Sequence, residues 1–112
     1  MNSFDVNITK VRENAIIPTK ATSGSAGFDL HACIDKDLTI KKGDLIRIPC
    51  GIAIELPSSA YAALIFARSG LGMKYGISLS NGVGVIDSDY RGEIMVALHN
   101  HSNTTAKIDA KE

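Results

Sequence analysis

Apolar residues alternate with other residues in short bursts along this chain. The pattern is clearest over residues 38–40, 45–48 and 52–56, and alternation with a period of two is typical of strands that bury one face. No window holds the sustained period of 3.6 that an amphipathic helix requires. We therefore expect an all-β fold with almost no helix, in which about eight to ten strands form a sandwich or barrel.

Turn-forming residues separate these bursts. Four such segments are Lys41–Asp44, Pro57–Ser59, Ser69–Gly72 and Asn81–Gly82. The turn that contains Gly43 lies between residues 37–40 and 45–48, and glycine supplies the positive φ that tight turns often need. This turn predicts a plain β-hairpin.

The size and charge of the chain limit its function. Its 112 residues and 11.9 kDa correspond to one small domain, residues 1–112, near the lower limit for a self-sufficient core. Twelve basic residues balance twelve acidic ones, whereas proteins that bind nucleic acids without regard to sequence carry a positive excess. Polymeric nucleic acid is therefore not an expected ligand.

Cys33 and Cys50 are the two cysteines, and each lies among apolar residues. Without a CxxC pair or a dense cysteine framework, they are more typical of reduced thiols in a cytosolic core than of a disulfide. We identify neither a secretory leader nor an apolar run long enough to cross a bilayer. A cytoplasmic protein without membrane association is expected.

Asp87 and Tyr90 lie three residues apart in a turn-rich segment, residues 81–93, flanked by apolar strands. An aspartate carboxylate is ionised at neutral pH, and beside a phosphate group it can orient and deprotonate a water molecule. A neighbouring ring can lie flat against a sugar and leave no space for a 2′-hydroxyl. The structural alternative is that Asp87 bonds to amides of its own turn and that Tyr90 packs on its own sheet.

Arg68, Ser69 and Gly70 follow the apolar residues 61–66. A guanidinium, a hydroxyl and a flexible turn suit the oxygens of a phosphate, although an exposed β-turn explains these residues equally well. The segment lacks the spacings of the Walker A loop, of GxGxxG and of the nucleophile elbow GxSxG.

His99 and His101 flank Asn100, a spacing that places both rings on one face of a strand as candidate metal ligands. No cysteine or carboxylate at ligand-like spacing completes the set, so a metal site is not expected there. No Cys/His or Ser/His/Asp arrangement supports covalent catalysis.

Three segments resemble, in order and approximate spacing, the first three motifs of the homotrimeric deoxyuridine triphosphate nucleotidohydrolases, the dUTPases. They are Ala26–Leu30 (AGFDL), Arg68–Gly72 (RSGLG) and Gly84–Gly92 (GVIDSDYRG). The resemblance implies a distorted jelly-roll β-barrel or sandwich and a homotrimer with active sites between subunits. It also implies the hydrolysis of dUTP to dUMP and pyrophosphate.

The resemblance assigns expected roles to two groups of residues in the reaction itself. Asp87 is expected to activate the attacking water, and Tyr90 is expected to lie under the deoxyribose. Arg68, Ser69 and Gly70 are expected to contact the triphosphate.

A third group is expected around the base and the metal. Asn81 and the backbone of Val85 and Ile86 are expected to read the uracil edge, in a pocket that Met95 also lines. Asp29 is expected to have a supporting role near the metal and triphosphate. Mg²⁺ is expected as a cofactor that is carried by the substrate phosphates without a direct protein ligand.

Two later family motifs are missing from this sequence: a segment resembling Gly-Asp-Arg-Ile-Ala-Gln, and a Gly-rich arm that brings Arg and Phe over the nucleotide. Lys111 and Glu112 stand where Gly-Asp is usual, and within the matched part Ala67 replaces a frequent Pro and Phe28 a frequent Tyr. We expect a truncated form that lacks a lid over the triphosphate. Such a chain should hydrolyse dUTP poorly or not at all, and turnover equal to that of a full-length relative would contradict this expectation.

Two other functions stay open at this point. A deoxycytidine triphosphate deaminase shares this fold, but it is expected to carry a Glu near the position of Asp87 and a different basic loop. The second alternative is a non-catalytic, dUTPase-like module that binds a nucleotide for regulation, which the missing motifs keep open.

Overall fold

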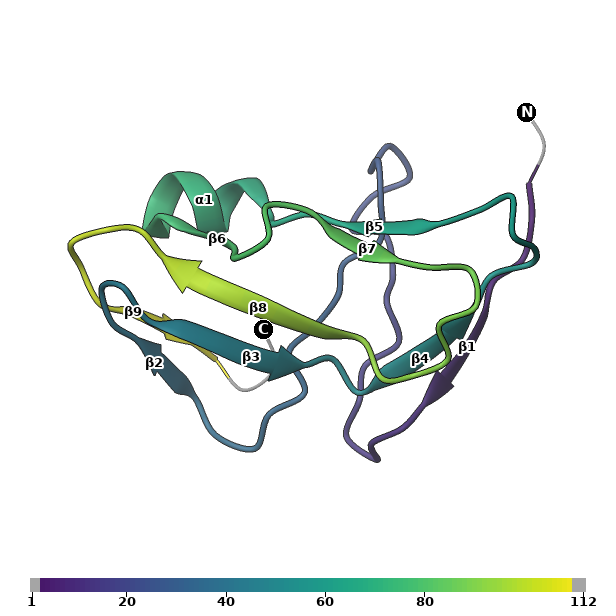
Figure 1. The fold of residues 1–112 in the computed structure, drawn as a ribbon. Coiled ribbons are helices and arrows are strands. Elements are labelled where there is room, and N and C mark those ends of the chain that lie inside the picture. Colours follow the sequence, from purple (N-terminus) through teal and green to yellow (C-terminus); the bar gives the residue numbers. More distant parts are fainter. Residues whose placement is uncertain (1–2, 110–112) are drawn as a thin grey trace.

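A computed structural model describes residues 3–109, in which the chain forms nine strands and one short helix (Figure 1). The elements are β1 Asn7–Lys10, β2 Leu38–Ile40, β3 Leu45–Pro49, β4 Ile52–Glu55, β5 Ala63–Ile65, α1 Ser69–Tyr75, β6 Ile77–Leu79, β7 Gly84–Ile86, β8 Met95–Asn100 and β9 Ala106–Ile108. The prediction of an all-β fold is confirmed, and β2, β3 and β4 coincide with the three clearest alternating segments.

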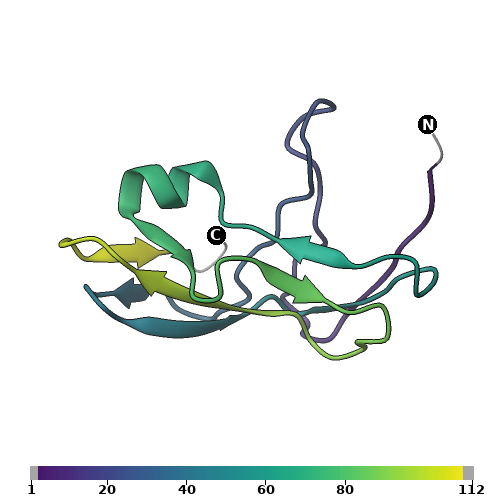
Figure 2. The ribbon, with the colours of Figure 1, turned by 45° about the horizontal axis from the view of Figure 1, so that its top comes forward.

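The strands pair over long distances in the sequence. β8 lies between β3 and β6 in a three-stranded antiparallel sheet, and the remaining pairs are β1 with β4, β2 with β9, and β5 with β7. In the view of Figure 2, α1 and β5 lie along one side of the molecule, and β2 and β3 lie along the other. Crossing connections between antiparallel strands of this kind are typical of a jelly-roll-like sandwich.

The predicted hairpin at Gly43 is wrong. The turn itself forms, because the Asp44 N–H donates to the Lys41 carbonyl (3.0 Å) and Gly43 adopts a φ of +81°. The flanking strands nevertheless join different sheets, since β2 pairs with β9 and β3 pairs with β8. The turn wraps around Asn100, whose side chain donates to the Ile40 carbonyl (2.8 Å) and whose N–H donates to the Asp44 carbonyl (3.2 Å).

The Asn100 side chain joins three segments of the chain. It is 1% exposed, and its Nδ2 donates to the carbonyls of Ile40 (2.8 Å) and Thr104 (2.9 Å). Its Oδ1 accepts from the N–H (2.9 Å) and the hydroxyl (2.8 Å) of Ser102. These four bonds hold the ends of β2 and β8 against the turn that leads into β9.

The helix α1 replaces the turn that the sequence indicated at Ser69–Gly72. Glycine costs about 1 kcal/mol in a helix relative to alanine, so Gly70 and Gly72 argued against a helix, and α1 has no buried residue that would produce a helical period. Half-buried Leu71 packs against the core. Within residues 3–109 no helix has the length and apolar character needed to cross a bilayer.

The core consists of two clusters of buried side chains. The larger is built from Ile40, Ile48, Ile77, Leu79, Leu98, Ala106 and Ile108. The smaller is built from Ala15, Cys33, Cys50, Ile52 and Ile94. Half-buried Ile65 and Val96 pack against both clusters, so the clusters form one continuous interior.

Gly51 lies at the bend between β3 and β4. Its φ of +74° is a conformation that other residues rarely adopt. A Cβ at this position would lie 2.7 Å from the Ala15 Cβ and 2.8 Å from the Cys33 Sγ. The bend therefore requires glycine for its backbone conformation and for its close packing.

Cys33 and Cys50 are buried free thiols in the smaller cluster, which confirms the prediction of reduced core cysteines. Burial raises the pKa of the Cys50 thiol from its ordinary 9.0 to about 11, and the nearby Glu93 and Cys33 act in the same direction. The thiol stays neutral in the folded protein where it would ionise in the unfolded chain.

Alkaline conditions should therefore weaken the fold through Cys50. Because the pKa of Cys50 is higher in the folded protein than in the unfolded chain, its protonated thiol adds up to about 3 kcal/mol to the free energy of unfolding. This contribution is fully present below about pH 9 and is lost as the pH rises through 11. Urea unfolding followed by circular dichroism should show a shallower alkaline fall in Cys50→Ala than in the wild type. Equal pH slopes for the two proteins would contradict this assignment.

Candidate active site

Two adjoining hollows lie beside β7 and the start of β8, and both are lined by Val85, Ile86 and Met95. The first has a volume of about 110 Å³, and its other lining residues are Ile65, Leu79, Asn81, Gly84, Val96 and Ala97. The second has a volume of about 170 Å³, and its other lining residues are Asp87, Tyr90 and Glu93. A recess whose lining residues are mostly aliphatic thus adjoins one whose lining includes two acids and a phenol.

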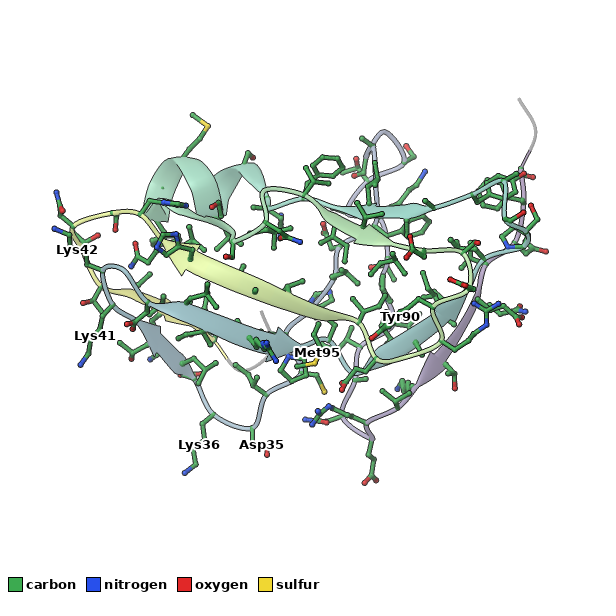
Figure 3. The ribbon with its side chains drawn as sticks, viewed as in Figure 1. Asp35, Lys36, Lys41, Lys42, Tyr90 and Met95 are labelled. Atoms are coloured by element: carbon green, nitrogen blue, oxygen red, sulfur yellow. The ribbon has the colours of Figure 1, made fainter. Side chains whose placement is uncertain are left out.

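Six of the predicted site residues meet at these hollows: Asn81, Val85, Ile86, Asp87, Tyr90 and Met95. Asn81 lies just before β7, in a turn where the Gly82 N–H donates to the Leu79 carbonyl (2.9 Å). Figure 3 shows Tyr90 just before β8 and Met95 at its start, whereas Lys41 and Lys42 lie at the other end of the molecule.

Residues 87–90 form a tight turn that carries Asp87 and Tyr90. The Tyr90 N–H donates to the Asp87 carbonyl (3.1 Å). Arg91 braces the turn, because its Nη1 donates to the carbonyls of Ser88 (2.8 Å) and Tyr90 (3.3 Å). The Arg91 Nε also lies 3.7 Å from the Glu55 Oε2, an exposed ion pair of small energetic value.

The Tyr90 ring lies over the backbone of Gly92. Its hydroxyl donates to the Glu93 carbonyl (2.8 Å). A Cβ at position 92 would lie 2.6 Å from the Tyr90 Oη and 2.7 Å from its Cζ, so glycine leaves room for the ring. The side chain remains 44% exposed and lines the larger hollow, which leaves ring surface available to a ligand.

The Asp87 carboxylate lines the same hollow as Tyr90 and belongs to an exposed residue. Among residues 3–109 no group forms a hydrogen bond or ion pair with this carboxylate, the amides of its own turn included. The carboxylate can therefore accept hydrogen bonds from water or from a ligand in the hollow.

The remaining predicted residues form a second group that lines neither hollow. Arg68 precedes α1, and Ser69 and Gly70 are its first two residues. The Arg68 Nε lies 3.9 Å from the Asp29 Oδ1, and Asp29 is anchored by its N–H, which donates to the Thr19 carbonyl (2.8 Å). The Arg68 group therefore lies outside the lining of both hollows.

Comparison with known proteins decides the family. The dUTPase family model matches residues 13–112. The chain is 54% identical over 105 residues to the deoxyuridine 5′-triphosphate nucleotidohydrolase of Desulfitobacterium hafniense, covering 92% of this chain and 70% of that protein. It is 47% identical over 112 residues to the protein of the same name from Bordetella avium, covering 100% of this chain and 75% of that protein. The chain belongs to the dUTPase family.

The fold of this dUTPase is also that of solved structures. A dUTPase from phage phi11 of S. aureus superposes with a TM-score of 0.82 at 16% identity, over 97% of this chain and 85% of that one. At this identity the likeness concerns the fold alone. The phage protein coordinates a structural Mg(II) ion.

Three residues at or near the candidate site were missed by sequence reasoning: Arg12, Gly92 and Glu93. Gly92 and Glu93 lie within the segment that the sequence already indicated, and their roles emerge only from their contacts with Tyr90. Arg12 contacts Glu93 from 81 positions away, and no local pattern marks it.

The described part of this dUTPase contains no group of three or more His, Cys, Asp or Glu side chains that could hold a metal ion. The rings of His99 and His101 lie with centroids 4.2 Å apart at 66°. The His101 Nε2 lies 2.7 Å from the Ser78 hydroxyl, so this ring nitrogen already has a hydrogen-bond partner.

Proposed function

We propose that this protein hydrolyses dUTP to dUMP and pyrophosphate, by attack of a water molecule that Asp87 activates. The observation that carries the proposal is the shared hollow of Asp87 and Tyr90, next to the recess lined by Asn81, β7 and Met95. The activity is that in the name of relatives 47% to 54% identical to this chain.

The smaller recess takes the uracil. Asn81 and the backbone of Val85 and Ile86 supply hydrogen-bonding groups for the edge of the base, and Met95 supplies apolar contact. The deoxyribose then lies on the ring of Tyr90, where a 2′-hydroxyl has no room. Aliphatic side chains combined with a few polar groups are the usual lining of a small-molecule site.

Asp87 acts as the general base. Its carboxylate accepts a hydrogen bond from a water molecule, takes its proton, and directs the oxygen in line at the α-phosphorus, so that pyrophosphate leaves. Positioning of the water and neutralisation of the phosphate charge supply most of the acceleration. No covalent intermediate is needed.

The phosphates are held by Arg68, Ser69 and Gly70, with Asp29 in a supporting role. These residues line neither hollow of their own chain, which is compatible with a homotrimer in which they reach the site of a neighbouring subunit. Mg²⁺ supplies charge neutralisation on the triphosphate. Mg²⁺ keeps several of its waters, so the substrate phosphates would carry it.

The same proposal places the enzyme in the cytoplasm, where its two buried thiols stay reduced. Deamination of dCTP is not favoured, because the relatives carry the name of the dUTP hydrolase.

The test is a single-turnover assay with protein in excess of nucleotide and Mg²⁺ present, combined with calorimetric binding of a non-hydrolysable dUTP analogue. We expect pyrophosphate from dUTP and no ammonia from dCTP. Ammonia release would make the protein a deaminase. Tight binding of the analogue without any pyrophosphate, in a form of the protein that also carries the two later family motifs, would make it a regulatory nucleotide-binding module.

A further inference from the structure

Glu93 connects the candidate site to the body of the protein. Its carboxylate accepts hydrogen bonds from the Arg12 Nε (2.6 Å) and Nη2 (3.1 Å) and from the Gly51 N–H (3.0 Å). The two-pronged contact between a guanidinium and a carboxylate fixes orientation as well as distance. Arg12 lies just after β1, so the N-terminal part of the chain supports the far end of the third motif.

The same residue holds Tyr90 through its main chain. The Glu93 carbonyl accepts the Tyr90 hydroxyl (2.8 Å), and the Tyr90 N–H donates to the Asp87 carbonyl (3.1 Å). The side chain of Glu93 is thus tied to Arg12 and Gly51, and its backbone is tied to the phenol. A shift of Glu93 would be passed directly to the ring.

The structure that supports Glu93 is closely packed and hydrogen-bonded. Gly51 is packed so closely that a Cβ would overlap Ala15 and Cys33, and its carbonyl accepts the Val11 N–H (2.8 Å). The residue after Glu93 is Ile94, whose N–H donates to the Ile52 carbonyl (2.8 Å). Gly51 therefore presents its N–H to the carboxylate from a fixed direction.

The Tyr90 ring, in contrast, is not locked by core packing. It is 44% exposed, and its position depends on the open space at Gly92 and on the hydroxyl bond to Glu93. A ring can exclude a 2′-hydroxyl only if it cannot retreat from the sugar, so its tether matters for selectivity as much as its size does.

We propose that the Arg12–Glu93 ion pair is a positioning device that holds the Tyr90 ring where it rejects ribose, and that it thereby sets the preference for deoxyribonucleotides. The inference rests on the proposed function, in which the sugar lies on Tyr90. Arg12 lowers the pKa of Glu93 and Glu93 raises the pKa of Arg12, so both partners are charged at neutral pH.

The test compares the calorimetric affinities of non-hydrolysable analogues of dUTP and UTP. We expect Arg12→Met to lower the preference for the deoxy analogue by about tenfold, chiefly because the ribose analogue binds better. Gly92→Ala displaces the ring directly and should lower the preference at least as far. Lys107→Met is the matched control, because it removes a surface ion pair with Asp37 (3.2 Å) whose residues line neither hollow.

Arg12→Lys keeps the charge but cannot make the two-pronged contact, so it should give a preference between those of the wild type and Arg12→Met. It replaces Arg12→Met in the test if circular dichroism shows that Arg12→Met does not fold. A folded Arg12 variant with the wild-type preference overturns the inference. Equal weakening of both analogues also overturns it, because that is the effect of general destabilisation. The wild type could also show no preference for the deoxy analogue, with Tyr90→Ala binding that analogue as tightly as the wild type does. In that case the proposed placement of the sugar on Tyr90 fails, and the inference fails with it.

Discussion

Replacing Asp87 with Asn should lower the rate of dUTP hydrolysis by about 10²- to 10⁴-fold, the usual contribution of a general base. The amide has nearly the shape of the carboxylate but cannot take the proton of the attacking water. The affinity for a non-hydrolysable dUTP analogue should change little, because Asp87 is expected to contact the water rather than the base or the sugar. Rates come from single-turnover pyrophosphate release and affinities from calorimetry.

Asp89 provides the matched control for this substitution. It is an exposed carboxylate two residues away in the same turn, and it lines neither hollow. Asp89→Asn should therefore retain nearly the wild-type rate. Equal losses in the two variants would mean that the reaction depends on the negative charge of the turn as a whole, and Asp87 would lose its assignment as the base.

Replacing Asn100 with Leu should destabilise the folded protein by roughly 4 kcal/mol. The substitution removes four hydrogen bonds and leaves the Ile40 carbonyl without its bond from Nδ2 in a buried position. Because small domains are stable by only about 5 to 15 kcal/mol, such a loss lowers the urea midpoint strongly. The chain has no tryptophan, so circular dichroism is the suitable signal.

Asn103 is the control for Asn100, since it lies in the same turn but is exposed. Asn103→Leu should change the free energy of unfolding by no more than about 0.5 kcal/mol. A small effect of Asn100→Leu, similar to that of the control, would mean that the junction of β2, β8 and β9 tolerates the loss of its central side chain.

The strands were predictable from the sequence, but their partners were not. Alternation of apolar residues located β2, β3 and β4, because it depends only on which face of a strand is buried. The incorrect hairpin at Gly43 shows the limit. A tight turn fixes a change of direction, while the pairing of the flanking strands depends on distant residues, such as Asn100, which contacts Ile40 from 60 positions away. The helix α1 was missed because it buries none of its residues.

The candidate site likewise contains residues that the sequence predicts and contacts that it does not. Asn81, Val85, Asp87 and Tyr90 lie in one short segment whose turn chemistry is visible in the sequence, so they could be proposed together. The contact of Arg12 with Glu93 depends on the pairing of β1 with β4 and on the bend at Gly51. Such an interaction exists only after the chain has folded, and a single sequence gives no signal for it.

The pairing of β2 with β9 has a consequence for biosynthesis. Ile40 lies opposite Ala106 in this pair, so its backbone partner leaves the ribosome dozens of residues after Ile40 itself. Contacts between distant positions also slow folding in free solution, because the intervening loop must close before they form. Nascent chains should thus keep the β2 edge uncovered until β9 has been synthesised, a period in which chaperones have access to it.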